Sequence, residues 1–419
     1  MGMTMAEKIL ARASGKKEVK AGEYVTAEID MIMTHDGFAN ISSELEKAGI
    51  MKVADPEKIV VLLDHQVPPG SLAGAEKYKK VREAVKKFKI KYWYDWNSGI
   101  CHQIMAEKGH VLPGSLIIGC DSHTTTYGAF GAASTGMGMS DATYAVAVGS
   151  QWFRVPETIK FILNGALPRR VMSKDVLLYI AGKYTAEVAQ YKAVEFTGAA
   201  AKEMSISSRM TMSNMGVEIG AKFAFFAADE KTLEFLKSRT TKPVSQFGPD
   251  PDAVYQKVYE VDLSTLEPQV AFPHNVDKVR PISEAGDVRI DQAFLGSCTN
   301  ARLEDLQGAA ELLKGRRIHP DVRMIVSPAS MEVYREAMRQ GLFDIFIDAG
   351  AIIQNPTCGA CQGLHTGLLA AGERCISSTN RNFKGRMGSP ESEVYLASPM
   401  VVAASALAGK IADPRKLVS

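Results

Sequence analysis

The stretch QAFLGSCTN (residues 292–300) decides the fold, because it joins a short apolar run directly to a polar turn. Apolar runs of this kind recur along the chain, and segments of helical character follow many of them. Short strands that alternate with helices predict an α/β fold with largely parallel sheets. The other runs that predict strands cover residues 58–63, 115–119, 159–163, 322–326 and 351–354.

Three helices have clear signals in the sequence. Ser173 and Ser330 stand where an N-cap is expected, since a serine hydroxyl can accept a hydrogen bond from a free N–H of the first turn. In the lysine-rich stretch 76–91, apolar residues such as Val81 and Val85 recur at helical spacing. We therefore interpret its lysines as the solvated face of a helix rather than as a binding patch.

Composition bounds the class of protein. A chain of 419 residues suits two or three domains, and 46% hydrophobic with 23% charged residues is typical of a globular protein. The formal net charge of +2 gives no field that would attract nucleic acid or an anionic membrane. The N-terminus lacks the apolar core of a secretory signal, the uncharged stretch 394–409 is short for a membrane span, and six cysteines form no disulfide framework. We predict a cytoplasmic, reducing location.

Five polar clusters each come directly after an apolar, strand-like run. In open parallel sheets, chemistry gathers outside the carboxyl ends of the strands, where loops from several strands converge. We therefore expect these clusters to form one shared site. They are Asp64-His65, Asp121-Ser122-His123, Cys298-Thr299-Asn300, Cys358-Gly359-Ala360-Cys361 and Asn380-Arg381-Asn382.

Three cysteines are the sharpest chemical signal. Cys358 and Cys361 form a C-x-x-C, which alone fits a zinc site or a redox pair, and Cys298 lies upstream in another strand-end turn. Three cysteines without an obvious fourth would leave one iron of an iron–sulfur cluster open, whereas electron-transfer clusters normally close all four. Zinc with His365 as a further ligand is the alternative. We expect Cys375 to lie in the core, and Cys101 and Cys120 to belong to other strand–loop units.

Together, these segments resemble the aconitase superfamily, and within it the branch of the 3-isopropylmalate dehydratase and homoaconitase large subunits. The resemblance runs from about residue 3 to the C-terminus. It implies three α/β domains, at residues 1–155, 156–284 and 285–419, around a shared central cleft. Residues 273–286, rich in Pro, Gly and Asp, support the second boundary. The segments that carry the resemblance are LDHQ (63–66), DSHT (121–124), GSCTN (296–300), NPTCGAC (355–361) and NRNFKGR (380–386).

The resemblance also implies a partner and a reaction. Full-length aconitases carry a swivelling fourth domain, for which we expect no counterpart in this chain. A separate small subunit that carries that domain is implied, in a heterodimer or heterotetramer. The expected reaction is reversible dehydration and hydration of a 2-hydroxy di- or tricarboxylate. Our preferred substrate is 3-isopropylmalate, by way of isopropylmaleate.

Residue roles follow from the same resemblance. Cys298, Cys358 and Cys361 would hold one [4Fe–4S] cluster per chain, whose open iron would bind the substrate hydroxyl and a carboxylate. The pairs Asp64-His65 and Asp121-x-His123 would be acids, because a carboxylate orients an imidazole and raises its basicity. The other residues that the resemblance assigns are Glu218 and His102 as catalytic residues, and Asn214, Asn380, Arg381 and Arg386 as substrate-binding or cluster-neighbouring residues.

Each of these roles has a simpler alternative. His102 could be a hydrogen-bonded core histidine, and Glu218 could be a solvated helix residue. Arg381 and Arg386 could pair with Glu391 or Glu393. For the whole chain, the alternatives are a zinc-stabilised binding protein and an RNA-binding relative of the aconitases. Near-zero net charge disfavours RNA binding.

Two departures from the isopropylmalate branch concern the substrate. After Asp121-Ser122-His123, most members of that branch read Thr-Cys-Thr-His-Gly, whereas this chain has Thr125 and Tyr127 at the second and fourth of these positions. Cys120 stands where alanine is usual. Neither departure touches an expected cluster ligand. The substrates that remain open are homocitrate, 2-methylmalate (citraconate) and 2,3-dimethylmalate.

Overall fold

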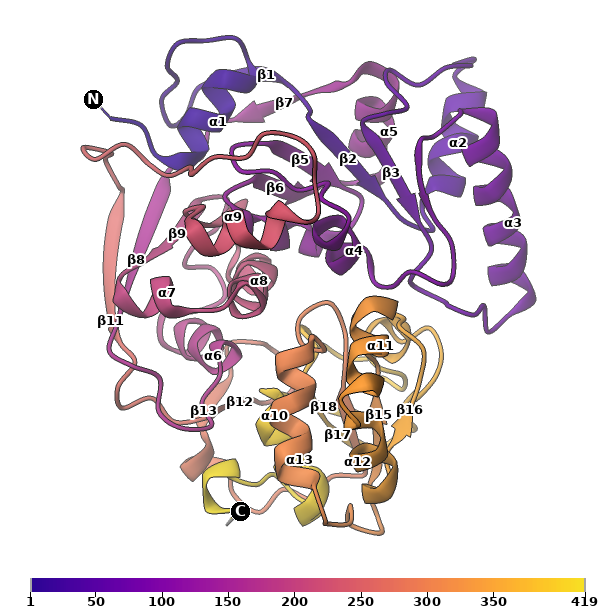
Figure 1. Ribbon diagram of the computed structural model, residues 1–419, viewed down its shortest axis with the longest axis vertical. Helices are drawn as coiled ribbons and strands as arrows, with labels where there is room; N and C mark the ends of the chain where they lie inside the picture. Colours follow the sequence, from indigo (N-terminus) through magenta and orange to yellow (C-terminus); the bar gives the residue numbers. More distant parts are fainter. Residues whose placement is uncertain (1, 418–419) are drawn as a thin grey trace.

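The computed structural model describes residues 2–417, and its strands form three larger sheets and one two-stranded ribbon (Figure 1). The first sheet has the strand order β4-β3-β2-β5-β6, and all its strands are parallel. Strands β2, β3 and β5 are buried along their whole length, as expected for a parallel sheet with both faces covered. The strands are β2 (Met31–Thr34), β3 (Ile59–Leu62), β4 (Tyr92–Tyr94), β5 (Leu116–Gly119) and β6 (Ala133–Gly136).

Helices of the N-terminal part connect these strands and pack against one another. The helices are α1 (Met5–Ala13), α2 (Phe38–Lys47), α3 (Leu72–Lys87), α4 (Cys101–Glu107) and α5 (Met139–Val148). Helix α3 confirms the helix predicted for the lysine-rich stretch, with its start moved to Leu72, and it buries Val81 and Val85. The ribbon pairs β1 (Tyr24–Glu28) with β7 (Ser150–Arg154) in antiparallel register.

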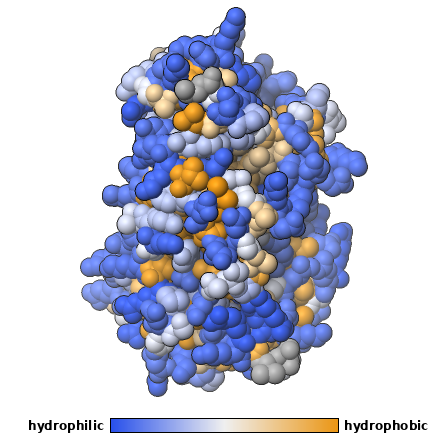
Figure 2. All heavy atoms as spheres, turned by 90° about the vertical axis from the view of Figure 1, so that its left-hand side faces the viewer, coloured by the Kyte–Doolittle hydropathy of each residue, from blue (hydrophilic) through white to orange (hydrophobic). Residues whose placement is uncertain are grey.

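The second sheet has the order β10-β9-β8-β11 and is also entirely parallel. Its edge strand β11 lies along the left of Figure 1, and the face that Figure 2 turns toward the viewer is largely hydrophilic with small hydrophobic groups near its centre. The strands are β8 (Thr158–Asn164), β9 (Ala193–Thr197), β10 (Phe223–Phe226) and β11 (Lys257–Asp262). The helices are α6 (Ser173–Tyr184), α7 (Ala199–Glu203), α8 (Ile206–Asn214) and α9 (Glu230–Lys237).

The third sheet has the order β13-β12-β18-β17-β14-β15-β16. Its five strands from β14 to β18 are parallel, while β12 and β13 add an antiparallel edge. The strands are β12 (Gln269–Ala271), β13 (Val279–Pro281), β14 (Gln292–Leu295), β15 (Arg323–Val326), β16 (Ile352–Ile353), β17 (Arg374–Ser377) and β18 (Glu393–Ala397). The helices are α10 (Leu303–Leu313), α11 (Met331–Arg339), α12 (Leu342–Ala349) and α13 (Pro399–Ala408).

Short 3₁₀ helices lie in the loops, several of them after strand ends. They are η1 (Ser122–Phe130), η2 (Met215–Ile219), η3 (Ile282–Glu284), η4 (Gly359–Gln362) and η5 (Pro414–Lys416). Within residues 2–417, no helix combines the length and the apolar character that crossing a membrane requires.

The predicted strands are confirmed within one or two residues at each end, and β14 coincides with the predicted run. Ser330 is the N-cap of α11, and its hydroxyl accepts from the N–H of Val333 at 3.1 Å. The prediction for Ser173 is wrong, because Met172 is the cap residue of α6. The cap fails there because the buried carboxylate of Asp175 already accepts from the N–H of Met172 at 2.8 Å.

The division into three domains stays a prediction. Strand β12 precedes residue 285 yet pairs with β18, so residues upstream of the predicted second boundary contribute two strands to the third sheet.

Candidate active site

The strand-end clusters converge on one cavity between the sheets. Each predicted cluster contributes at least one side chain to its wall, although Asp64 and Asn380 lie 316 positions apart in the sequence. The predicted site residues that line the cavity are Asp64, His65, His102, Asp121, His123, Cys298, Cys358, Cys361, Asn380, Arg381 and Arg386. The two others, Asn214 and Glu218, reach the wall through hydrogen bonds.

The loop after β3 presents Asp64 and His65 as a buried ion pair. Asp64 Oδ1 lies 2.6 Å from His65 Nδ1, and Asp64 Oδ2 accepts from the N–H of Cys101 at 2.8 Å. Burial would raise the pKa of Asp64, but the charge of His65 and its hydrogen bond outweigh burial and lower the pKa to about 2. Burial would lower the pKa of His65, but Asp64 and Asp121 raise it well above its usual value. Both shifts favour the charged forms of the pair, a carboxylate beside an imidazolium.

Asp121 is the hub of the site. Its Oδ1 accepts from His102 Nε2 at 2.8 Å and from the backbone N–H of His123 at 2.8 Å. Its Oδ2 lies 3.7 Å from His65 Nε2. Burial opposes ionisation of Asp121, but the hydrogen bonds from these three histidines lower its pKa well below the ordinary range. One carboxylate thus hydrogen-bonds the ring of His102 and lies 3.5 Å from His123 Nδ1 and 3.7 Å from His65 Nε2.

Glu218 links the second acid pair to a substrate-binding candidate. Its Oε1 lies 2.8 Å from His123 Nε2 and accepts from Arg381 Nε at 2.7 Å. Burial would raise the pKa of Glu218, but the hydrogen bond to His123 and the charges of His123 and Arg381 lower it. Burial would lower the pKa of His123, but Asp121 and Glu218 raise it. Negative and positive side chains therefore alternate from Asp121 through His123 and Glu218 to Arg381.

Two simpler alternatives are thereby excluded. Glu218 lies in the short helix η2 but is not solvated, because its side chain is only 9% exposed and binds His123 and Arg381. Arg381 pairs with Glu218 rather than with Glu393, whose carboxylate binds Arg374.

The turn after β14 directs Cys298 into the cavity. Ser297, just before it, is buried and has a φ of +81°, a left-handed conformation that a serine adopts at some cost in strain. The Cys298 sulfur accepts from the side-chain amides of Asn214 at 3.3 Å and Asn380 at 3.6 Å. Burial raises the pKa of the Cys298 thiol to about 12.

The loop after β16 supplies the other two sulfurs. The hydrogen bond that Cys361 accepts from Cys358 lowers the pKa of Cys361 to about 5, and the guanidinium of Arg386 adds to this effect. Arg386 Nη2 lies 3.9 Å from the Cys361 sulfur. Arg386 Nε is buried and has no hydrogen-bond partner among residues 2–417. The wall around the sulfurs therefore keeps an unused donor and a positive charge.

These sulfurs fit an iron–sulfur cluster better than a zinc ion. Three cysteines line one cavity with amide and guanidinium donors aimed at their sulfurs, and hydrogen bonds to sulfur are a common feature of iron–sulfur sites. His365, the fourth ligand of the zinc alternative, is absent from the cavity wall. Its Nε2 instead lies 3.4 Å from the hydroxyl of Thr357.

The loop that carries Cys358 and Cys361 also holds the first acid pair in place. The N–H of Cys358 donates to the carbonyl of Asp64 at 2.9 Å, and the N–H of Gly359 donates to that of His65 at 3.2 Å. The Thr357 hydroxyl adds a bond to the Asp64 carbonyl at 3.0 Å. Ordering of the cysteine loop and placement of the acid pair are therefore coupled.

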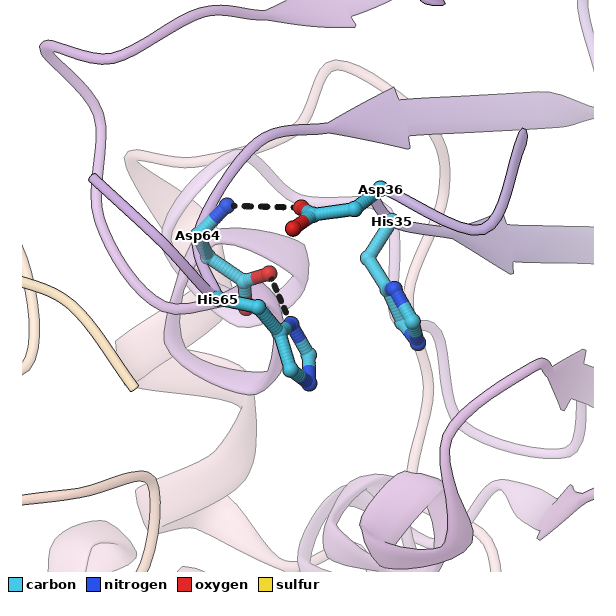
Figure 3. Close-up of side chains that lie close together, drawn as sticks. All are labelled: His35, Asp36, Asp64 and His65. Carbon is cyan, nitrogen blue, oxygen red and sulfur yellow. Dashed lines mark hydrogen bonds and ion pairs between the residues drawn. The ribbon is translucent and has the colours of Figure 1, made fainter. Parts of the chain in front are cut away.

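The sequence analysis missed a sixth strand-end cluster, His35-Asp36, which follows β2 directly. In Figure 3 the rings of His35 and His65 project side by side, and their centroids lie 4.1 Å apart. Asp36 accepts from the N–H of Asp64 at 3.4 Å and from the Tyr78 hydroxyl at 3.0 Å. The same criterion that found the other five clusters would have found this one.

His35, Asp36, Asp64 and His65 lie close enough together to suggest a separate metal site. Their ligand atoms are already used, however. Asp64 binds His65 and the N–H of Cys101, and Asp36 binds Tyr78. We interpret the group as a hydrogen-bonded support for the acid pair.

Tyr127, one of the departures, contacts a predicted catalytic residue. Its hydroxyl lies 3.1 Å from His102 Nδ1, and the Tyr127 side chain is fully buried. A phenol that donates to Nδ1 leaves the ring proton on Nε2, where Asp121 accepts it. His102 is thus held in one orientation from both sides and lines the cavity, and its catalytic role stays a prediction.

We predict that Asp121→Asn lowers turnover by about 10²- to 10⁴-fold, the range for loss of acid–base function. The amide keeps the shape of the side chain but removes the charge that orients His102 and His123. Steady-state kinetics of the reconstituted enzyme would measure the loss, and iron content should stay at the wild-type value. The matched control is Asp287→Asn at an exposed surface ion pair. A decrease of less than threefold for Asp121→Asn would contradict the role of Asp121 as the hub.

The chain is similar to known proteins in both sequence and fold. A model of the aconitase family (aconitate hydratase) matches residues 7–288 and 283–409. The chain is 50% identical, over 100% of its length and 98% of the relative's, to the 3-isopropylmalate dehydratase large subunit of Aquifex aeolicus. It is 51% identical, over 99% of both chains, to the 3-isopropylmalate dehydratase large subunit 1 of Methanopyrus kandleri.

A solved structure shares the fold. Aconitase X of Thermococcus kodakaraensis matches with a TM-score of 0.50 and 14% sequence identity, over 85% of this chain and 84% of that one. The two molecules therefore share an aconitase-like α/β architecture.

Proposed function

The chain belongs to the aconitase family, and we propose that it is the large subunit of a 3-isopropylmalate dehydratase. It is a hydro-lyase chain of the family's α/β fold. The observation that carries the proposal is the convergence of three cysteine sulfurs, two histidine–carboxylate pairs and two arginines on one cavity. That set matches the dehydration of a hydroxy acid that bears two carboxylates.

The family implies an iron–sulfur cluster, and we propose one [4Fe–4S] cluster on Cys298, Cys358 and Cys361. When bound, the cluster supplies a Lewis acid at the iron that has no protein ligand. Amides of Asn214 and Asn380 and the guanidinium of Arg386 stabilise the anionic sulfurs. Thiolate ligands and buried free cysteines require a reducing compartment, so a cytoplasmic location is part of the proposal.

The residues of this chain would bind the substrate and move its protons. His65 and His123, both with raised pKa values, are held as proton donors by Asp64 and Asp121. Arg381 and Arg386 would bind the two carboxylates, because a guanidinium can bind a carboxylate through two parallel hydrogen bonds. Arg381 would exchange part of its ion pair with Glu218 for the substrate. Burial of these groups excludes water and strengthens each electrostatic contact.

The relatives' name, large subunit, supports a small-subunit partner. We propose that this partner carries the swivelling domain, in a heterodimer or heterotetramer, and that it supplies the base for the Cα proton. The substrate's variable group would be read there as well. The isopropyl group of 3-isopropylmalate is preferred over the other substituents because the full-length relatives bear that name.

We predict that the anaerobically reconstituted two-chain enzyme dehydrates 3-isopropylmalate faster than homocitrate, 2-methylmalate or 2,3-dimethylmalate. Formation of the unsaturated product can be followed by ultraviolet absorbance. Exposure to air should abolish activity, and ferrous iron with thiol should restore it, because an iron without a protein ligand is lost first. A preference for another acid in the panel would overturn the substrate. Activity that is stable in air for hours would overturn the open-iron site.

A further inference from the structure

Lys174 is a buried cation that the mechanism above leaves without a role. It is the second residue of α6, and its side chain is fully buried. Burial removes the ammonium from water, and the N-terminus of a helix carries a partial positive charge that repels it. Both effects disfavour a lysine at this position. A residue that breaks two local rules at once is a candidate for a functional role.

The ammonium of Lys174 crosses to the third sheet. Its Nζ donates to the carbonyl of Ser378 at 2.5 Å and also to the carbonyl of Thr379. These two residues form the turn that follows β17 and leads directly into Asn380 and Arg381. One side chain therefore anchors this turn from a different part of the chain, 204 positions away in the sequence.

The Ser378–Thr379 turn also holds the loop that carries Cys298. The hydroxyl of Ser378 accepts from the N–H of Gly296 at 3.0 Å, at the end of β14. Asn380 donates to the Thr299 hydroxyl at 2.9 Å and lies 3.6 Å from the Cys298 sulfur. A displacement of the Ser378–Thr379 carbonyls would therefore reach a cysteine sulfur through two hydrogen-bonded residues.

One of the charged groups near Lys174 is a proposed cluster ligand, Cys361. Burial lowers its pKa to about 7, while the negative charges of Cys361 and Asp175 oppose that shift. An anionic cluster on the cysteine sulfurs would add to this opposition and favour the charged ammonium. No ion pair joins Lys174 to a carboxylate in the described part of the chain, so its contacts are the two carbonyls.

We propose that Lys174 is a positioning residue for the metal centre: its ammonium fixes the Ser378–Thr379 turn, and through Asn380 it holds the Cys298 sulfur in place. The inference rests on the cluster proposed above. It predicts that loss of the ammonium loosens the cluster more than it loosens the protein.

The test compares Lys174→Met and Lys174→Gln with wild type and with Lys183→Met. Lys183 lies on the same helix and is exposed, and its contacts among residues 2–417 are with Tyr179 and Tyr184, so it controls for the substitution itself. Each protein is reconstituted anaerobically, and the release of iron to a ferrous chelator is timed. Lys174→Met leaves the buried carbonyls unpaired and should speed the release of iron by about tenfold. Lys174→Gln keeps a donor, so its rate of iron release should lie between those of wild type and Lys174→Met. The visible circular dichroism of the cluster should change only in the Lys174 variants.

Thermal unfolding of the cluster-free proteins separates a positioning role at the cluster from a general role in the stability of the fold. Two results would overturn the inference. One is an equal rate of iron release from all four proteins. The other is a rise in the rate of iron release that the lower stability of the cluster-free variant fully accounts for. Failure of both Lys174 variants to fold would overturn it too, because the residue would then serve the fold as a whole. Wild-type protein that takes up no iron would refute the proposed function. Iron held equally well by wild type and Lys174→Met would refute the inference alone.

Discussion

Replacement of Cys298, Cys358 or Cys361 by serine is expected to abolish iron binding and turnover together. Each thiolate supplies one of three proposed protein ligands, and a serine hydroxyl stays protonated near neutral pH and binds iron poorly. Reconstituted wild-type protein should be brown, with several irons per chain and broad absorption near ~400 nm. Each serine variant should be colourless, with iron content and turnover at background. Elemental analysis and ultraviolet–visible spectra measure both.

Two further cysteines provide matched controls. Cys375 is fully buried in β17 and is not part of the cavity wall, so Cys375→Ser should keep its iron. Cys101 also lines the cavity, at the start of α4. It is not one of the three proposed ligands, so we expect Cys101→Ser to keep its iron.

These controls also decide between the alternatives for the metal. Stoichiometric zinc without iron in the wild-type protein would contradict the hydro-lyase proposal. Loss of the cluster in Cys101→Ser would instead identify a fourth ligand and remove the open iron.

The chain on its own is expected to hold the cluster and yet turn over substrate negligibly. Abstraction of a Cα proton needs a base with a suitable pKa near that carbon. The pKa values of Asp64, Asp121 and Glu218 are all lowered by neighbouring cations, which makes these carboxylates weak bases. Addition of the cognate small subunit should raise turnover from background to the full rate, measured by product absorbance under anaerobic conditions.

Exchange of the small subunit tests which chain reads the variable group. A small subunit from a homoaconitase should shift the substrate preference, because specificity is a difference in transition-state binding at the group that varies. Arg381 and Arg386 should stay essential with either partner, since the shared carboxylates are bound in this chain. Vigorous turnover by the large chain alone would refute this division of roles.

The strands and the shared site were predictable because both depend on local patterns. Parallel strands buried on both faces appear as short apolar runs, and β14 therefore coincides with its predicted run. Strand-end polar residues converge in such sheets regardless of the length of chain between them. The same rule covers His35-Asp36, whose omission was a failure to apply it after β2.

Other features could not be predicted, since they depend on partners distant in sequence. Ser173 has the residue type of an N-cap, but the cap residue is Met172, whose N–H binds Asp175. Asp175 also accepts from the N–H of Gln269, 94 positions away. Lys174 resembles a solvated helix lysine until its acceptors are known. Arg381 had two carboxylates nearby in sequence, yet its partner is Glu218, 163 positions away.

The sequence by itself determined the fold class, the family and the residues that gather at the strand ends. Periodicity and short motifs are enough for these, because they follow from backbone geometry and from residues that are neighbours along the chain. Only the tertiary structure decided how the gathered groups are charged. Asp121 lies beside the rings of His65, His102 and His123, Glu218 joins His123 to Arg381, and Lys174 holds the turn before Asn380. Protonation depends on burial and on the nearest opposite charge, and those are properties of position in space rather than of order in the chain.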